Sequence, residues 1–395
     1  MCVLAGCALV SAPAHASTTI AKPSGLQARQ ALLIETDTGT TLFARGANAR
    51  VPIASTTKLM TAYVTLETQS LGHVFVEQPY AASQDESLAG LTPGARYNVA
   101  DLLRAMLIAS GGDAANTLAL DIGHGSMARF LALMNADAKQ LGLTHTHYTT
   151  PVGLDTPGNY SSAANLATLA QVLLRNKFFA KVVSEPEAIL HDGLVVANTD
   201  DLIGAYPFMV GVKTGHTQDA GYCLVGAASW HGVHLMSVVL GDPSNAARDA
   251  DTLKLLRYGL RLYHHVTIAV RGRSYFTLGV SGGSTQKVAL VAARSAGIVI
   301  SRAVAVHVAL AGVPAQLQAP LAAGTQVGAI DVTENGKLAL SVALLTQAAV
   351  AAAPESGASY GVVILALFVL GGCSLGGMRA RARRRARRRR RLVAR

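Results

Sequence analysis

Cysteine is scarce in this chain of 395 residues, which has four. Cys2, Cys7 and Cys373 lie near the two ends, so Cys223 alone remains in the body of the chain. A single thiol cannot form an internal disulfide, which excludes a disulfide-bonded scaffold. Cys223 stands in the apolar run Tyr222–Ala228, where a small core residue is expected. No histidine is marked out as the partner that a cysteine nucleophile would need.

The body of the chain also lacks an excess of charge, although the formal net charge is +11. Residues 379–395 contain eleven arginines and no acidic residue. The 34 lysines and arginines less these eleven leave 23, which equals the 23 acidic residues. The basic character therefore belongs to one tail, and we expect no nucleic-acid-binding surface on the folded part.

Charge is absent altogether from residues 359–378, just before that tail. The stretch is about as long as a bilayer core requires, which predicts a transmembrane helix. Arginines at its C-terminal end are typical of the cytoplasmic side. We therefore expect an anchor in the cytoplasmic membrane, with the body outside the cytoplasm, in the periplasm. The alternative is a buried core helix, which rarely runs so long without a charge.

The N-terminal residues 1–16 resemble an export signal that lacks its usual basic start. Met1–Val10 is apolar, and Ala14-His15-Ala16 precedes Ser17 as a signal-peptidase site does. We interpret the missing basic residues as a start codon placed too late. Leu4-Ala5-Gly6-Cys7 resembles a lipoprotein cleavage site, but six residues are too few for its signal. Both interpretations predict export.

Three short motifs carry the chemistry: Ser55-Thr56-Thr57-Lys58, Ser110-Gly111-Gly112 and Lys213-Thr214-Gly215. Serine is a poor nucleophile near neutral pH and needs an adjacent base. If Ser55 opens a helix, Lys58 lies one turn on, on the same face. Apolar residues follow at helical spacing, as expected of a buried helix. The alternative is that Ser55 only caps a core helix.

The other two motifs supply what this pair requires. A lysine crowded by a second cation can lose its proton near pH 7, and we expect Lys213 to be that cation. Ser110 would relay a proton, and Thr214 would fix the substrate. Single motifs recur by chance, since Ser281-Gly282-Gly283 and Ser284-Thr285-Gln286-Lys287 copy two of them. The second copy leads into a strand-like run, so nothing would hold its lysine above its serine.

With these residues in view, the chain resembles the D-alanyl-D-alanine carboxypeptidases, the low-molecular-mass penicillin-binding proteins. The likeness extends over about residues 30–350 and is most specific at residues 52–61, 211–217 and 221–225. It implies removal of the terminal D-alanine from the stem pentapeptide of peptidoglycan, inhibition by β-lactam antibiotics as covalent ligands, and no cofactor. Supporting segments are Gly153-Leu154-Asp155, Asn159-Tyr160-Ser161-Ser162-Ala163 and Asn198-Thr199.

The resemblance also implies further site residues. The backbone N–H groups of Ser55 and His216 would form the oxyanion hole, beside Gly215, while a direct acid–base role for the His216 imidazole stays a weaker alternative. Arg248 would bind the substrate carboxylate beside Thr214, or else be a solvated helix residue. For His145-Thr146-His147 we expect a solvated face and no metal, because no acidic partner is near in the sequence.

One position departs from the family pattern. The family usually has asparagine as the third residue of the middle motif, and this chain has Gly112. The asparagine is expected to bind the substrate amide and to help position the lysine of the first motif. Glycine can do neither, so a water, Asp113 or Asn116 would have to substitute. Reduced or altered turnover is the expected consequence.

Three other functions compete. A β-lactamase of the same superfamily needs a glutamate to activate water, and between Gly112 and Lys213 the only glutamates are Glu185 and Glu187, neither with an asparagine four residues on. A DD-endopeptidase shares the motifs and stays open. A non-catalytic wall-binding protein becomes conceivable because of Gly112.

The organisation predicts an α/β (α+β) domain of the penicillin-recognising transpeptidase/β-lactamase type. Strand patterns at both ends of a helical middle indicate an antiparallel sheet covered by helices. After His265, short alternating runs with glycine turns, including Asn335-Gly336, predict a small all-β domain. The predicted parts are a signal peptide (1–16), the catalytic domain (17–264), the all-β domain (265–350), a linker (351–358), the transmembrane anchor (359–378) and the cytoplasmic tail (379–395).

Overall fold

The computed structural model describes residues 20–83, 86–301, 306–334 and 336–354. The described residues divide into two compact units: one contains residues 20–266 and 299–301, and the other contains residues 267–298 and 306–354. The predicted signal peptide, transmembrane anchor and arginine tail lie outside the described residues, and the linker is described only as far as residue 354. In the part of the chain that the structure describes, no helix is long and apolar enough to cross a bilayer.

A five-stranded antiparallel sheet forms the centre of the first unit, in the order β2-β1-β9-β8-β7. The sequence prediction of an antiparallel sheet covered by helices is confirmed. The strands β7, β8 and β9 follow one another as a meander, and β9 pairs with β1 from the beginning of the chain. The strand β7 therefore lies at an edge of the sheet. The bounds are β1 Gln30–Glu35, β2 Thr41–Arg45, β7 Met209–Thr217, β8 Gly221–Trp230 and β9 Val233–Asp242.

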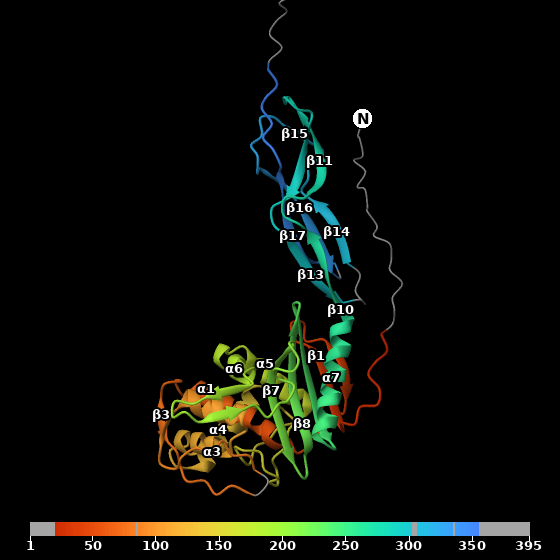
Figure 1. The fold of residues 1–395 in the computed structure, drawn as a ribbon. Helices are drawn as coiled ribbons and strands as arrows, with labels where there is room; N and C mark the ends of the chain where they lie inside the picture. Colours follow the sequence, from red (N-terminus) through yellow and green to blue (C-terminus); the bar gives the residue numbers. More distant parts are fainter. Residues whose placement is uncertain (1–19, 84–85, 302–305, 335, 355–395) are drawn as a thin grey trace, which may run out of the picture. The chain divides into compact units, whose positions relative to one another are not determined.

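Both faces of this sheet are buried, because successive side chains of a strand point to opposite faces. On β1, Leu32 and Ile34 join one hydrophobic cluster and Leu33 joins the other. On β8, Val225 and Leu224 divide between the clusters in the same way. The long helix α7 packs against β1, β8 and β9, and Figure 1 shows the sheet between α7 and the group of shorter helices.

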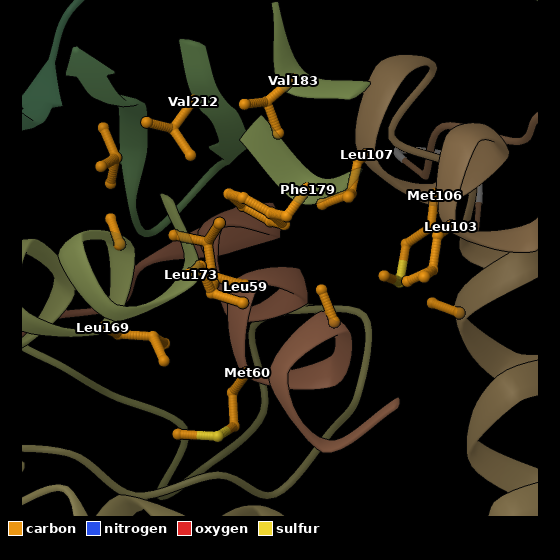
Figure 2. Close-up of a cluster of buried hydrophobic side chains, with 14 of the residues drawn as sticks. Leu59, Met60, Leu103, Met106, Leu107, Leu169, Leu173, Phe179, Val183 and Val212 are labelled. Atoms are coloured by element: carbon orange, nitrogen blue, oxygen red, sulfur yellow. The ribbon is translucent and has the colours of Figure 1, made fainter. Parts of the chain in front are cut away.

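The shorter helices build the larger of the two clusters. In Figure 2, Leu59 and Met60 of α1 lie among side chains of α2, α5 and α6, with Val212 of β7 close by. Such burial on all sides immobilises α1, the helix that follows Ser55. The bounds are α1 Lys58–Thr68, α2 Val99–Ile108, α3 Gly112–Ile122, α4 Met127–Gln140, α5 Ala163–Leu174, α6 Lys177–Val183 and α7 Asn245–Leu262.

Sequence patterns missed the shortest elements of this unit. The helix α6 begins where the Asn176 side chain accepts hydrogen bonds from the backbone of Phe178 and Phe179. Its two turns are too few for a clear helical period. Two hairpins of three-residue strands were also missed, because three residues show no alternation: β3 Val74–Val76 with β4 Arg96–Asn98, and β5 Glu187–Ile189 with β6 Val195–Ala197.

The second unit is all-β, as the sequence predicts. A six-stranded sheet, in the order β14-β16-β17-β12-β11-β15, surrounds its own small core. Ser284 lies in the bend before β12 and Lys287 is the first residue of that strand, so no helix holds Lys287 above Ser284. The bounds are β10 Tyr263–Ala269, β11 Ser274–Ser281, β12 Lys287–Ala292, β13 Ala296–Ser301, β14 Val306–Ala311, β15 Gln316–Gln318, β16 Gln326–Glu334 and β17 Lys337–Thr346, and β10 pairs with β13.

Candidate active site

Ser55 lies in a turn of 3-10 helix, Ala54–Thr57, that runs directly into α1. The Lys58 side chain is fully buried, and its Nζ lies 2.9 Å from Ser55 Oγ and 2.9 Å from the carbonyl oxygen of Val152. The spacing of three residues along the helical turn thus places amine and hydroxyl within hydrogen-bond distance. A neutral lysine amine could accept the serine proton along this line.

Burial lowers the pKa of Lys58 to about 8, while the negative charges of Glu86 and Asp113 act in the opposite direction. Lys213 is also buried, and burial followed by the charge of Lys58 lowers its pKa well below the usual lysine value. Repulsion between two ammonium groups is mutual, so this pair of lysines interacts as the sequence predicts, although burial is the larger effect on both. Desolvation is the principal cause for Lys58, since an ammonium loses its hydration shell in the core.

Ser110 is buried between the end of α2 and the beginning of α3 and lines the same cavity as Ser55. Its backbone is left-handed, with a φ of 61°, a conformation that non-glycine residues rarely adopt. The surrounding helices hold this serine in an uncommon conformation, as is often found at functional sites. The cavity has a volume of about 200 Å³.

The edge strand β7 forms one wall of this cavity through Thr214, Gly215 and His216. A Cβ atom at Gly215 would lie 3.0 Å from the backbone nitrogen of Ser55 and 3.1 Å from the carbonyl oxygen of Ile53. The absence of a side chain at Gly215 thus favours the close approach of β7 to the turn that bears Ser55. The exposed imidazole of His216 stacks on Tyr222, with ring centroids 4.0 Å apart.

Arg248 lines the cavity from α7 and is only 3% exposed, so the alternative of a solvated helix arginine is wrong. Its guanidinium donates to Asp249 Oδ1 through Nε at 2.9 Å and Nη2 at 2.7 Å. Thr214 lines the same cavity, and Lys213 Nζ donates to its carbonyl oxygen at 3.2 Å. The structure thus brings Arg248 and Thr214 to one pocket.

The supporting segments of the sequence hold these parts in place. A Cβ atom at Gly153 would lie 2.5 Å from the carbonyl carbon of Ala54, so glycine is required beside the Ser55 turn. Asp155 accepts hydrogen bonds from the Thr217 hydroxyl at the end of β7 and from the backbone of Asp219. Asn159 Nδ2 donates to Thr57 Oγ1 at 3.2 Å.

The position of the middle-motif asparagine is filled by a residue that the sequence analysis did not identify. Glu86 lines the cavity beside Ser55 and Ser110, and its side chain lies directly over Gly112. Neither of the two residues expected to substitute, Asp113 and Asn116, fills this position. The Asp113 carboxylate accepts hydrogen bonds from the backbone of residues 89–91 instead, and Asn116 is not among the residues that line the cavity. Glu86 precedes Gly112 in the sequence, outside the segment 112–213 in which a catalytic glutamate was expected.

The remaining candidates take no part in this site. Cys223 is buried, and burial raises the pKa of its thiol to about 12, which makes it a poor nucleophile. His147 Nδ1 lies 2.8 Å from the carbonyl oxygen of Gly158, and His145 Nδ1 lies 3.1 Å from Thr144 Oγ1. Within the described ranges, no group of three histidine, cysteine or acidic residues could hold a metal ion.

Two protein families resemble this chain, one over each of its two parts. Residues 16–244 match the family described as D-alanyl-D-alanine carboxypeptidase, and residues 263–352 match the C-terminal domain of penicillin-binding protein 5. The carboxypeptidase DacC of Escherichia coli is 32% identical over 336 residues, which are 82% of this chain and 84% of DacC. The carboxypeptidase DacF of Bacillus subtilis is 30% identical over 79% of this chain and 83% of its own length.

Solved structures show the same likeness. Penicillin-binding protein 5 from Haemophilus influenzae is 29% identical, with a TM-score of 0.58 over 84% of this chain and 99% of that one. The DD-transpeptidase of Streptomyces K15 is 33% identical, with a TM-score of 0.58 over 62% of this chain and 100% of that one.

Proposed function

Because the chain belongs to the D-alanyl-D-alanine carboxypeptidase family and is a peptidase with that activity, we propose that it removes the terminal D-alanine from peptidoglycan stem pentapeptides through an acyl-enzyme on Ser55. The observation that carries the proposal is the 2.9 Å contact between Lys58 Nζ and Ser55 Oγ, in a cavity shared with Ser110 and β7. An activated hydroxyl beside an edge strand suits attack on a peptide carbonyl.

Acylation begins when the neutral amine of Lys58 accepts the Ser55 proton, while Oγ forms a bond to the carbonyl carbon of the penultimate D-alanine. The carbonyl oxygen becomes an oxyanion and receives hydrogen bonds from the backbone N–H groups of Ser55 and His216. When the intermediate collapses, the C–N bond breaks. The leaving amine takes the proton held by Lys58, relayed by the Ser110 hydroxyl.

Deacylation returns the enzyme to its starting state. Water attacks the ester carbonyl and gives one proton to Lys58, and Ser55 Oγ leaves and recovers that proton. The products are a peptide shortened by one residue and free D-alanine.

Binding of the substrate carboxylate is assigned to Arg248 and Thr214. Arginine suits a planar carboxylate because its N–H donors form a fixed fork. The Thr214 hydroxyl is held by Thr199 at 2.6 Å, so its direction is set before the substrate arrives. A penicillin carries a carboxylate beside its reactive amide, so the same groups would orient it for attack by Ser55. Covalent binding of β-lactams follows from this arrangement.

We assign the enzyme to the outer face of the cytoplasmic membrane, with the C-terminal helix as anchor and the tail in the cytoplasm. Support comes from the charge-free segment 359–378 followed by eleven arginines, and from the substrate, which lies outside the cytoplasm. DD-endopeptidase activity is the second candidate function, because cleavage of a cross-link at the same D-alanyl carbonyl would use the same residues.

A direct test incubates the whole chain, purified in detergent, with a pentapeptide that ends in two D-alanines. We expect release of free D-alanine, and the Ser55→Ala variant should release none. Mass analysis of cross-linked stem-peptide dimers, treated in the same way, separates endopeptidase from carboxypeptidase activity. Intact pentapeptide after incubation with a folded wild-type chain would refute the proposal.

A further inference from the structure

Gly112, the glycine that replaces the usual asparagine, lies directly under the side chain of Glu86. A Cβ atom at position 112 would overlap Glu86 Oε1 and lie 2.7 Å from Glu86 Cδ and 3.1 Å from Glu86 Cγ. Any side chain at 112 therefore collides with Glu86 unless one of them moves. The φ of Gly112 is not in the left-handed region, so the backbone does not require glycine here. Glycine at this position makes room for the carboxylate.

Two sets of contacts hold Glu86 in this place. The Tyr80 hydroxyl lies 2.8 Å from Glu86 Oε1 and 2.7 Å from Oε2, and it donates its hydrogen bond to the carboxylate. The backbone nitrogen of Gly112 donates to the carbonyl oxygen of Ser87 at 2.8 Å. Glu86 is thus oriented through its side chain and through the residue that follows it.

The Asp113 carboxylate, at the beginning of α3, binds the backbone of residues 89–91, which follow Glu86 in the chain. It accepts hydrogen bonds from the backbone N–H groups of Ala89, Gly90 and Leu91, at 3.0, 2.9 and 3.0 Å. With a fourth backbone hydrogen bond from Ala114 at 2.9 Å, this buried carboxylate is a rigid support. The segment from Glu86 to Leu91 is therefore built onto the middle motif itself, and it places Glu86 at the wall of the cavity.

The electrostatic effect of this placement falls on Lys58. The negative charge of Glu86, and to a smaller extent that of Asp113, raises the pKa of Lys58 against the effect of burial. Lys213 is the buried cation that interacts with the same amine, and the charges of Asp200 and Arg248 act on Lys213 in turn. During acylation Lys58 becomes an ammonium as it takes the Ser55 proton. A carboxylate across the cavity stabilises the charge that develops.

We propose that Glu86 is a positioning residue that replaces the missing middle-motif amide: its carboxylate stabilises the Lys58 ammonium formed during acylation and accepts a hydrogen bond from an N–H group of the bound peptide. This inference rests on the proposed acyl-enzyme function. An ionised carboxylate accepts hydrogen bonds but cannot donate them. Glu86 would therefore bind the N–H group of the substrate amide and not the carbonyl oxygen of that amide.

The test compares four variants with the wild-type chain: Glu86→Gln, Glu86→Ala, Gly112→Asn and the double variant Gly112→Asn with Glu86→Ala. The readouts are the second-order rate constant of acylation by one penicillin, the rate of deacylation, and the pH profile of acylation. Glu86→Gln keeps the size of the side chain and removes its charge. Glu187→Gln, at an exposed position on β5, is the matched control, and thermal melting shows whether each variant folds.

We expect Glu86→Gln and Glu86→Ala to slow acylation about 10-fold to 100-fold, the range for a lost hydrogen bond to a charged group. In Glu86→Gln the acid limb of the pH profile should move to lower pH, because the pKa of Lys58 falls when a nearby negative charge is removed. Glu187→Gln should change neither quantity. A merely structural role for Glu86 would leave the pH profile in place.

The double variant provides the sharpest comparison. Gly112→Asn alone should be acylated more slowly than the wild-type chain. The asparagine side chain would push Glu86 out of its place, and the space left to the asparagine itself would be too small for its own amide to bind the substrate. Removal of Glu86 opens that space, so the double variant should recover at least half of the loss caused by Glu86→Ala alone, measured on a logarithmic rate scale. A double variant no faster than Glu86→Ala would overturn the proposal.

Two further outcomes would also decide against it. Wild-type rates of acylation in both Glu86 variants would show that the carboxylate has no effect on Lys58. Loss of deacylation alone, with acylation unchanged, would assign Glu86 to activation of the hydrolytic water instead. If the wild-type chain bound no penicillin and released no D-alanine, the proposed function itself would fail. If it is active, and Ser55→Ala is not, then only the inference on Glu86 is at stake.

Discussion

The hydroxyl groups of Thr199 and Thr214 lie 2.6 Å apart, which ties the segment before β7 to the strand that lines the cavity beside Ser55. The backbone nitrogen of Thr199 in turn donates to the carbonyl oxygen of Ile108 at the end of α2. One residue therefore links the helix before Ser110 to the hydroxyl group of Thr214. Through this residue the middle motif and the strand motif are joined in one rigid site.

Replacing Thr199 by valine keeps the shape of the side chain and removes its hydroxyl. The Thr214 hydroxyl then loses its partner and its fixed direction, so acylation by penicillin should slow by about fivefold, as expected for one hydrogen bond of about 1 kcal/mol. Thr168→Val, on the exposed side of α5, is the control and should have no effect. Unchanged acylation by Thr199→Val would show that Thr214 needs no such support.

Ser55→Ala should abolish both the covalent penicillin adduct and the release of D-alanine, because the nucleophile is gone. Lys58→Ala should have nearly the same effect, and the double variant should be no worse than either, since the pair acts as a unit. Gel labelling with a fluorescent penicillin measures the adduct. The copy in the all-β unit provides a matched control: Ser284→Ala should label like the wild-type chain. An adduct on Ser55→Ala would exclude Ser55 as the nucleophile.

Acylation should depend on pH through Lys58, whose pKa burial lowers to about 8. The neutral amine is the base, so the rate constant should rise tenfold per pH unit below about pH 8 and level off above it. The measurement is stopped-flow acylation between pH 6 and 9.5, in buffers of constant ionic strength. A flat profile would mean that Lys58 is already neutral at pH 6 or takes no proton.

Lys58 should also make the free energy of unfolding depend on pH. The pKa of Lys58 in the folded chain is about 8, below its usual value of 10.5. Between these values the unfolded chain binds more protons, so this group makes the free energy of unfolding rise with pH across that window. Lys58→Met should remove the dependence, as measured by chemical denaturation at pH 8 and pH 10.

Asp242 should make the free energy of unfolding change with pH in the opposite direction. Burial, helped by the charge of Asp251, raises the pKa of Asp242 to about 7. From the usual value of 3.8 up to about 7 the folded chain binds the extra proton, so stability contributed by this group is lost as the pH rises. Asp242→Asn should therefore raise the melting temperature at pH 8 and change it little at pH 4. Equal effects at both pH values would contradict the assignment.

The proposed anchor predicts a separation of membrane binding from catalysis. A chain that ends after Ala353 should leave the membrane fraction and still release D-alanine, because every proposed catalytic residue precedes Thr267. Replacing the tail arginines by glutamine should weaken the orientation in the membrane. Digestion of the tail by protease added outside intact cells would contradict a cytoplasmic location.

Local patterns in the sequence were enough for the central pair of the site. Ser55 and Lys58 are three residues apart on one helical turn, so their contact follows from helix geometry alone. The strand β1 likewise follows from local sequence. The side chains of Leu32, Leu33 and Ile34 alternate between two cores, as in any strand that is buried on both faces. These features depend on neighbours in the chain.

Only the tertiary structure decided what surrounds that pair. Glu86 reaches Gly112 because Asp113 and Tyr80 hold its segment over α3, and no periodicity in the sequence records such a contact. The lowered pKa of Lys58 likewise comes chiefly from burial beneath the helices and the sheet. Desolvation and shape arise when distant segments pack together. The spacing of the motifs therefore predicted the contact between Ser55 and Lys58, and only the folded chain determined which carboxylate lines the cavity beside them.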